Sequence, residues 1–175
     1  VPEPQPDVVR TFFDDSIVNA WVQTFKDDLS ADYVSQLVDK STSHSGGASY
    51  RIKLQSAQAR GKMLYVNWVD NGSIDMSGFD FSNTFLELYY QPLLLRERVE
   101  VGFICGDNPY ASLRADISGY VTLTDADVQS GKWQRIQIPL SDFRDPSKTV
   151  FEANGSGRTD FDWTKCKGFT IAGSD

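Results

Sequence analysis

The stretch Gln134-Arg135-Ile136-Gln137-Ile138-Pro139-Leu140 decides the fold class, because Ile136 and Ile138 alternate with Arg135 and Gln137. Successive side chains of a β-strand point to opposite faces, so this period-two alternation is typical of a half-buried strand. Residues 84–90 and 99–104 alternate in the same way. Further strand-like runs, bounded by Gly, Asn, Asp or Ser, occupy residues 8–13, 49–54, 63–69 and 168–172.

These many short strands predict an all-β fold, a two-sheet antiparallel β-sandwich with jelly-roll topology. Helical signals are few. Residues 29–40 fit either a short helix, in which Ser30 is the cap, or a loop with a short strand. Residues 125–129 fit one helical turn.

The charge balance narrows the class of partner. The chain carries a net charge of −7 and has no sequence run near the roughly 20 apolar residues of a membrane helix. Binding to phosphate backbones or anionic membranes needs clustered Lys and Arg. We therefore expect no nucleic-acid partner and no direct membrane insertion, and neutral or cationic ligands remain open.

The length of 175 residues suits one domain of ordinary size. The alternating prolines of Val1-Pro2-Glu3-Pro4-Gln5-Pro6 favour an extended spacer. We expect residues 1–7 to be a Pro-rich linker and residues 8–175 to be the β-sandwich domain, within a longer multidomain chain.

The two cysteines, Cys105 and Cys166, lie far apart in the sequence and form no C-x-x-C pair. A metal-thiolate or redox motif is therefore a poor fit. Each lies beside a strand-like run, so they are either buried thiols, which we favour, or one disulfide.

Four segments occur in an order that carries a family resemblance. They are Phe12-Phe13-Asp14-Asp15 followed by Trp21, residues 44–52, residues 74–80 followed by 85–90, and Gly131-Lys132-Trp133-Gln134 continuing to Phe143. Together they resemble the β-sandwich carbohydrate-binding modules of bacterial polysaccharide-degrading systems. With the Pro-rich leader, the chain is similar to the C-terminal domains of bacterial surface glycan-binding proteins.

The resemblance implies a non-catalytic monomer that binds a polysaccharide or oligosaccharide outside the cell or on the bacterial cell surface. It needs no cofactor for function. Asp14 and Asp15 are either an acidic turn or half of a structural calcium site, a metal that takes about six to eight oxygen ligands. Such modules usually end in a closing strand that the sequence up to Asp175 does not show.

Strand parity and the resemblance together define a candidate binding face. A pyranose ring packs its C–H face on an aromatic ring, while amides, carboxylates and Arg bind its hydroxyls. The resemblance places the strands around residues 63–69, 99–104 and 113–115 on one concave face, where Gly102 leaves room for a sugar ring. The candidates are Trp21, Tyr65, Asn67, Trp68, Glu100, Tyr110 and Arg114.

Each candidate has a structural alternative. Tyr65 is equally a cross-strand packing partner, and Trp68 falls on the core parity of its strand. Glu100 and Arg114 can pair with each other across strands. We expect Trp21 in a loop. We assign Glu87 and Tyr89, which also alternate outward, to the other sheet, and expect Trp133 at the sandwich edge.

An enzyme is the weaker hypothesis. Glu97 and Glu100 are three residues apart, which on a strand turns them to opposite faces, whereas glycoside hydrolysis needs two carboxylates at a defined separation. The single histidine, His44, lies in a Ser/Gly loop and is expected to be solvated. We favour a binding module for a neutral β-glucan or hemicellulose. The alternatives are an adhesive or structural sandwich with a protein partner and a jelly-roll glycosidase or lyase.

Overall fold

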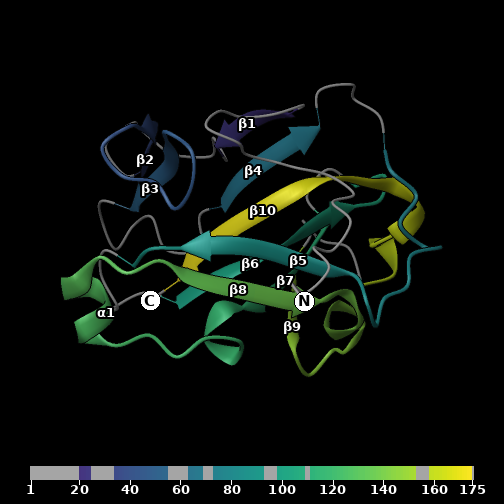
Figure 1. Ribbon diagram of the computed structural model, residues 1–175. Helices are drawn as coiled ribbons and strands as arrows, with labels where there is room; N and C mark the ends of the chain where they lie inside the picture. Colours follow the sequence, from purple (N-terminus) through teal and green to yellow (C-terminus); the bar gives the residue numbers. More distant parts are fainter. Residues whose placement is uncertain are drawn as a thin grey trace, which may run out of the picture.

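The computed structural model describes residues 20–24, 34–54, 63–68, 73–92, 98–108, 111–152 and 158–174. Six of the strands form one antiparallel sheet in the order β1-β4-β10-β6-β7-β9 (Figure 1). In that order the strands are β1 (Ala20–Thr24), β4 (Met63–Trp68), β10 (Cys166–Ser174), β6 (Arg98–Cys105), β7 (Ser112–Asp116) and β9 (Thr149–Glu152).

Two antiparallel pairs complete the described strands. One pairs β2 (Val34–Asp39) with β3 (Ser49–Leu54), and the other pairs β5 (Phe85–Tyr90) with β8 (Gln134–Pro139). The β5–β8 pair lies in front of β6, β7 and β10 in Figure 1. The predicted all-β antiparallel sandwich is confirmed.

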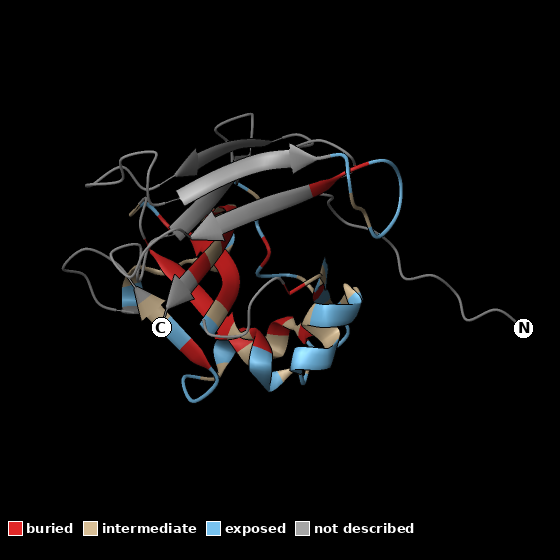
Figure 2. Cartoon of the chain, turned by 90° about the vertical axis from the view of Figure 1, so that its left-hand side faces the viewer, coloured by how far each residue is buried: buried red, intermediate tan, exposed pale blue. Residues whose placement is uncertain are grey.

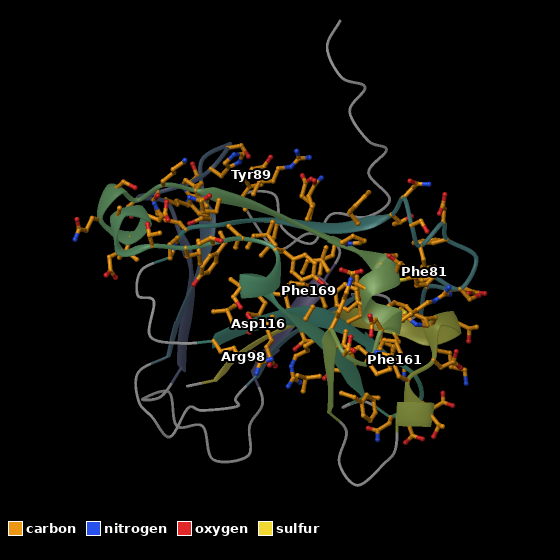
Figure 3. The ribbon with its side chains drawn as sticks, turned by 90° about the horizontal axis from the view of Figure 1, so that it is seen from below. Phe81, Tyr89, Arg98, Asp116, Phe161 and Phe169 are labelled. Atoms are coloured by element: carbon orange, nitrogen blue, oxygen red, sulfur yellow. A yellow bond between two sulfur atoms is a disulfide. The ribbon has the colours of Figure 1, made fainter. Side chains whose placement is uncertain are left out.

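The hydrophobic core lies between the six-stranded sheet and the β5–β8 pair. Every second residue of β5 and β8 points into it, among them Leu86, Ile136 and Ile138. They meet core residues of the six-stranded sheet such as Phe103 and Phe169. Phe169 lies between the two layers in the edge-on view of Figure 3, and Figure 2 shows the buried residues gathered there. Full burial of each large apolar side chain contributes roughly 1.5–3 kcal/mol, so these alternating positions hold the layers together.

Four aromatic rings seal one end of the core around Trp163. Its ring lies 5.1 Å from Phe81, 5.7 Å from Phe103 and 4.8 Å from Phe161, all edge-to-face. Phe103 also contacts the fully buried Phe143 at 5.2 Å. Edge-to-face pairs are favoured by the ring quadrupole, so these contacts fix how β6 meets the turns that follow β8 and precede β10.

Cys105 and Cys166 form a disulfide, which corrects the preference for free thiols. The two residues end β6 and begin β10, and the antiparallel register places them directly opposite each other. Sequence spacing could not show this, because the pairing depends on two strands meeting that are 61 residues apart.

The single described α-helix confirms the predicted turn near residue 125. Helix α1 (Asp125–Ser130) begins with a capping box, in which Thr124 and Asp127 each bind the other's backbone N–H, and it ends at Gly131 with φ of 62°. The other helical turns among the described residues are short 3-10 segments: η2 (Ile117–Gly119), η3 (Leu140–Arg144), η4 (Arg158–Asp160) and η5 (Trp163–Lys165). None of the helices in the described ranges has the length and apolar character needed to cross a bilayer.

Two local predictions need correction and one strand was missed. Residues 34–39 are strand β2, so the loop-and-strand alternative for residues 29–40 is right for this part and the helix is wrong. Trp21 belongs to strand β1 rather than to a loop. The edge strand β9 was not predicted. The strand expected at residues 8–13 lies outside the described residues.

Candidate functional site

The three strands predicted to share a face do belong to one sheet. β10 lies between β4 and β6, and β7 follows β6. The register sets Tyr65 opposite Thr170, Thr170 opposite Gly102 and Gly102 opposite Arg114. We call the side of this sheet that carries Thr170 and Arg114 the six-stranded face, because the alternate residues Phe169 and Leu113 point into the core.

A second row of the same sheet contains two more candidate positions. Trp21 on β1 is opposite Asn67 on β4, and Asn67 is opposite Gly168 on β10. Trp68 follows Asn67 on β4 and is opposite Ala20, so its parity on the strand is opposite to that of Asn67. The structure describes the backbone of β1 and β4 but not these side chains. Tyr110, Asp14 and Asp15 lie outside the described residues.

Glu100 and Arg114 form a buried ion pair. Arg114 Nε donates to Glu100 Oε2 at 3.0 Å, and only 5% of Glu100 and 4% of Arg114 is exposed. Arg114 Nη1 also donates to Ser112 Oγ at 3.0 Å, while Arg98 Nε lies 3.1 Å from Glu100 Oε1. The two residues thus pair with each other across strands, which is the structural alternative to glycan binding, and a direct contact with a glycan stays a prediction.

Gly102 has a structural role that the sequence did not show. A Cβ atom added at this position would collide with the backbone carbonyl of Leu113 on β7. The absence of a side chain is therefore required by the close approach of β6 and β7, whatever lies over the sheet.

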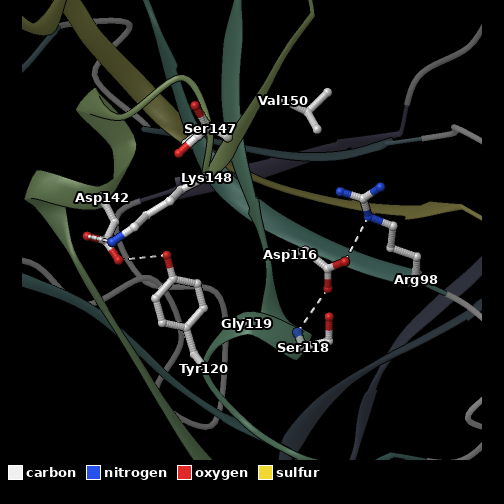
Figure 4. Close-up of a pocket in the computed structure, with 10 residues that line it drawn as sticks. Arg98, Asp116, Ser118, Gly119, Tyr120, Asp142, Ser147, Lys148 and Val150 are labelled. Carbon is white, nitrogen blue, oxygen red and sulfur yellow. Dashed lines mark hydrogen bonds and ion pairs between the residues drawn. The ribbon is translucent and has the colours of Figure 1, made fainter.

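A polar pocket of about 370 Å³ opens where β6 begins and β7 ends (Figure 4). Asp116 accepts hydrogen bonds from Arg98 Nε and from the backbone N–H of Ser118, both at 2.9 Å. Arg98 thereby joins the pocket to the buried pair of Glu100 and Arg114.

Asp142 organises the other side of this pocket. It accepts hydrogen bonds from the Tyr120 hydroxyl and from Lys148 Nζ, both at 2.9 Å. Burial and the bond to Asp142 raise the pKa of Tyr120 well above its usual 10, so the phenol stays a neutral donor. The charge of Lys148 is thus balanced by Asp142, and on the opposite side of the pocket the charge of Arg98 is balanced by Asp116.

The outward face of β5 and β8 carries exposed aromatic residues. The register places Phe85 opposite Pro139, Glu87 opposite Gln137 and Tyr89 opposite Arg135. Phe85 is 45% exposed and Tyr89 37% exposed. Tyr89 lies on the outer surface of this layer in Figure 3, on the far side of the core from Arg98 and Asp116. The alternation predicted Glu87 and Tyr89 on this second layer, as observed.

Sequence reasoning missed the partner of Tyr89. The ring of His44 stacks on that of Tyr89 with centroids 3.5 Å apart and planes 16° apart. The half-buried Trp133 meets His44 edge-on at 6.3 Å. His44 is exposed, as expected for its loop, but the tertiary contact between that loop and β5 left no signal in the sequence.

A metal site is not formed by the described residues, within which no group of three or more His, Cys, Asp or Glu side chains could hold an ion. The calcium prediction concerns Asp14 and Asp15, outside those ranges, and stays a prediction.

Comparison with known proteins identifies the family. The family model described as carbohydrate binding domain 30 matches residues 9–175. The fold is similar to a solved structure entitled "Crystal Structure of Family 30 Carbohydrate Binding Module", with a TM-score of 0.57 and 21% identity, over 94% of this chain and 83% of the other. A comparison with curated proteins finds no match. The chain is thus a non-catalytic carbohydrate-binding module and belongs to the carbohydrate binding domain 30 family.

Proposed function

We propose that this module holds a neutral β-glucan or hemicellulose chain over β1 and β4, beside the part of the six-stranded face where Thr170 and Arg114 are buried, without reacting with it. The observation that carries this proposal is the register of the sheet. Trp21 and Asn67 share one row, and Tyr65 belongs to the neighbouring row with Thr170. Two aromatic residues and one amide are thereby brought together on adjacent strands, which is the combination that a pyranose chain needs.

Charge supports a neutral glycan over an anionic one. The chain has a net charge of −7, which repels polyanions. Arg114 is one cation on this face that could have offset the repulsion, but it is paired with Glu100. Arg98 is likewise paired, with Asp116. Balanced ion pairs favour hydroxyl-rich neutral ligands over alginate or pectate.

We further propose that the module works as a monomer outside the cell or on a bacterial cell surface, within a larger multidomain chain. The disulfide between Cys105 and Cys166 supports this placement, because disulfides persist in oxidising compartments. A calcium ion bound at Asp14 and Asp15 would serve structure rather than binding.

Affinity electrophoresis tests the proposal. Native gels that contain soluble β-glucan, xyloglucan, mannan, alginate or pectate are run with the wild-type protein and with Trp21→Ala, Tyr65→Ala and Asn67→Ala variants. We expect retardation by one or more neutral glycans, no release of reducing sugar, and weaker retardation in the variants. A wild-type protein that migrates unchanged in every gel would favour the protein-partner alternative. Unchanged retardation in all three variants would place the site elsewhere.

A further inference from the structure

The outward side of the β5–β8 pair has the composition of a binding surface. We call it the Tyr89 face. It is formed by alternate residues of the two strands and by one loop residue, and its members are Phe85, Glu87, Tyr89, Arg135, Gln137 and His44. Phe85 and Tyr89 are two of the three exposed large apolar residues among those that the structure describes, and both lie on this face.

The two aromatic positions are spaced along one strand. Phe85 and Tyr89 are four residues apart on β5, and a strand rises about 3.3 Å per residue, so the rings start from backbone positions about 13 Å apart. Tyr89 is stacked against His44, which is itself met edge-on by Trp133. These contacts hold one of the two aromatic platforms in a fixed orientation before any ligand arrives.

Between the two platforms lies a prearranged hydrogen-bonding group. Glu87 Oε2 accepts from Arg135 Nε at 3.0 Å, from Arg135 Nη2 at 2.7 Å and from Gln137 Nε2 at 2.8 Å. All three residues are on the outward parity of their strands, and Glu87 and Arg135 are exposed. The charges of the Glu87 carboxylate and the Arg135 guanidinium cancel, so the face offers hydrogen-bond donors and acceptors without net charge.

We propose that the Tyr89 face is a second glycan-binding surface, which takes a chain of neutral β-linked pyranose units. The alternating apolar and hydroxyl-rich surfaces of such a chain match two aromatic platforms separated by a neutral polar network. The charges favour a neutral occupant, because Glu87 and Arg135 form an ion pair and offset each other, while the protein's net charge of −7 repels polyanions. The inference rests on the proposed function for the class of glycan, but not for the location of the site.

The Tyr89 face and the six-stranded face lie on opposite sides of the core. Figure 3 shows Tyr89 on the outer surface of one layer and Phe169 between the layers, with Arg98 and Asp116 on the other layer. One glycan segment cannot lie flat on both faces. The module would therefore contact two segments at once, and on an insoluble polysaccharide it would bridge neighbouring chains.

Isothermal titration with a soluble neutral β-gluco-hexasaccharide tests the inference through stoichiometry. We expect the wild-type protein to bind two equivalents. In Tyr89→Ala, one equivalent should keep its affinity and the other should bind about tenfold or more weakly, because the stacked ring is lost. Phe85→Ala and His44→Ala should weaken the same site. Tyr89→Phe is the matched control, because it keeps the ring, and it should keep both equivalents. Circular dichroism and thermal unfolding confirm that each variant is folded.

The outcomes separate this inference from the proposed function. One equivalent in the wild-type protein, lost in Tyr65→Ala and retained in Tyr89→Ala, would overturn the inference and leave the proposed site standing. One equivalent lost in Tyr89→Ala and retained in Tyr65→Ala would support the Tyr89 face and overturn the placement on the six-stranded face. Binding of a protein partner that Tyr89→Ala abolishes, with no glycan bound there, would overturn the inference as well.

Discussion

Glu100 and Arg114 lie on adjacent strands with Arg114 Nε 3.0 Å from Glu100 Oε2, and both side chains are buried. Removal of one partner from such a pair leaves an uncompensated buried charge, which typically costs about 3–5 kcal/mol. We expect Glu100→Gln or Arg114→Met to lower the free energy of unfolding, measured in urea, by an amount in that range. The double variant should lose less free energy of unfolding than the sum of the losses in the two single variants.

An exposed pair provides the control for this prediction. Arg135 and Glu87 lie 2.7 Å apart, with 48% and 36% of their side chains exposed. Exposed pairs contribute about 0–1 kcal/mol, so Glu87→Gln should change stability far less than Glu100→Gln. Equal losses in the two variants would contradict the structural role assigned to the buried pair.

The disulfide between Cys105 and Cys166 closes a long loop, with a sequence separation of 61. In the chain-entropy model, closing a loop of this length restricts the unfolded chain by about 4 kcal/mol. We expect the Cys105→Ser/Cys166→Ser double variant to unfold at a lower urea concentration than the wild-type protein. Its free energy of unfolding should be lower by an amount of this order. Addition of dithiothreitol should destabilise the wild-type protein and leave the double variant unaffected. Identical unfolding curves with and without the disulfide would contradict the pairing.

Acid should destabilise the fold through its capped turns. Hydrogen bonds from neighbouring Ser and Thr side chains lower the pKa of four aspartates below the ordinary 3.8: Asp75, Asp127, Asp145 and Asp162. A depressed pKa in the folded state means that the stabilisation is present above the unfolded value and is lost as the pH falls through the folded value. We expect the thermal midpoint to fall as the pH is lowered from about 4. Above about pH 4, these aspartates should cause little change in the midpoint.

Helix α1 offers a site-specific form of the acid experiment. Asp127 Oδ2 accepts from the backbone N–H of Thr124 at 2.8 Å, whereas Asp125 lies in the same turn and is outside that capping box. Asp127→Asn removes the charge from the cap, so the fall in stability with acid should be shallower than in the wild-type protein. Asp125→Asn is the matched control. An unchanged acid dependence in Asp127→Asn would show that the cap does not contribute.

The calcium prediction can be tested without knowledge of the site geometry. If Asp14 and Asp15 bind a structural calcium ion, EDTA should lower the thermal midpoint and excess Ca²⁺ should restore it. The Asp14→Asn/Asp15→Asn variant should be insensitive to both. A midpoint in the wild-type protein that neither reagent moves would leave the acidic turn as the remaining interpretation.

The strands were predictable where one face meets the core. In β8, Ile136 and Ile138 are buried while Arg135 is exposed, which is the alternation that the sequence shows. The same rule predicted the core residues Val101 and Phe103 of β6. Period-two alternation reflects which side of a strand is buried, so it predicts strands that have one face in the core and one face outside it.

The remaining features depend on tertiary contacts that no local pattern carries. β2 was ambiguous because the short apolar run from Val34 fits a helix or a strand, and its partner β3 decides between them. The stacking of His44 on Tyr89 joins a loop to a strand 45 residues away. Likewise, parity predicted that Glu100 and Arg114 leave the core, but not that they would be buried on that side.

Binding of a neutral glycan without reaction is tested most directly by an NMR titration of the isotopically labelled protein with a soluble neutral β-gluco-oligosaccharide, monitored through backbone amides. We expect saturable shifts on β1 and β4 near Trp21, Tyr65 and Asn67, and separately on β5 and β8 near Tyr89 and Arg135, with the oligosaccharide recovered intact. A spectrum that does not change at any concentration of the neutral oligosaccharides tested, or oligosaccharide that is cleaved during the titration, would contradict the claim that this module binds a neutral glycan without reacting with it.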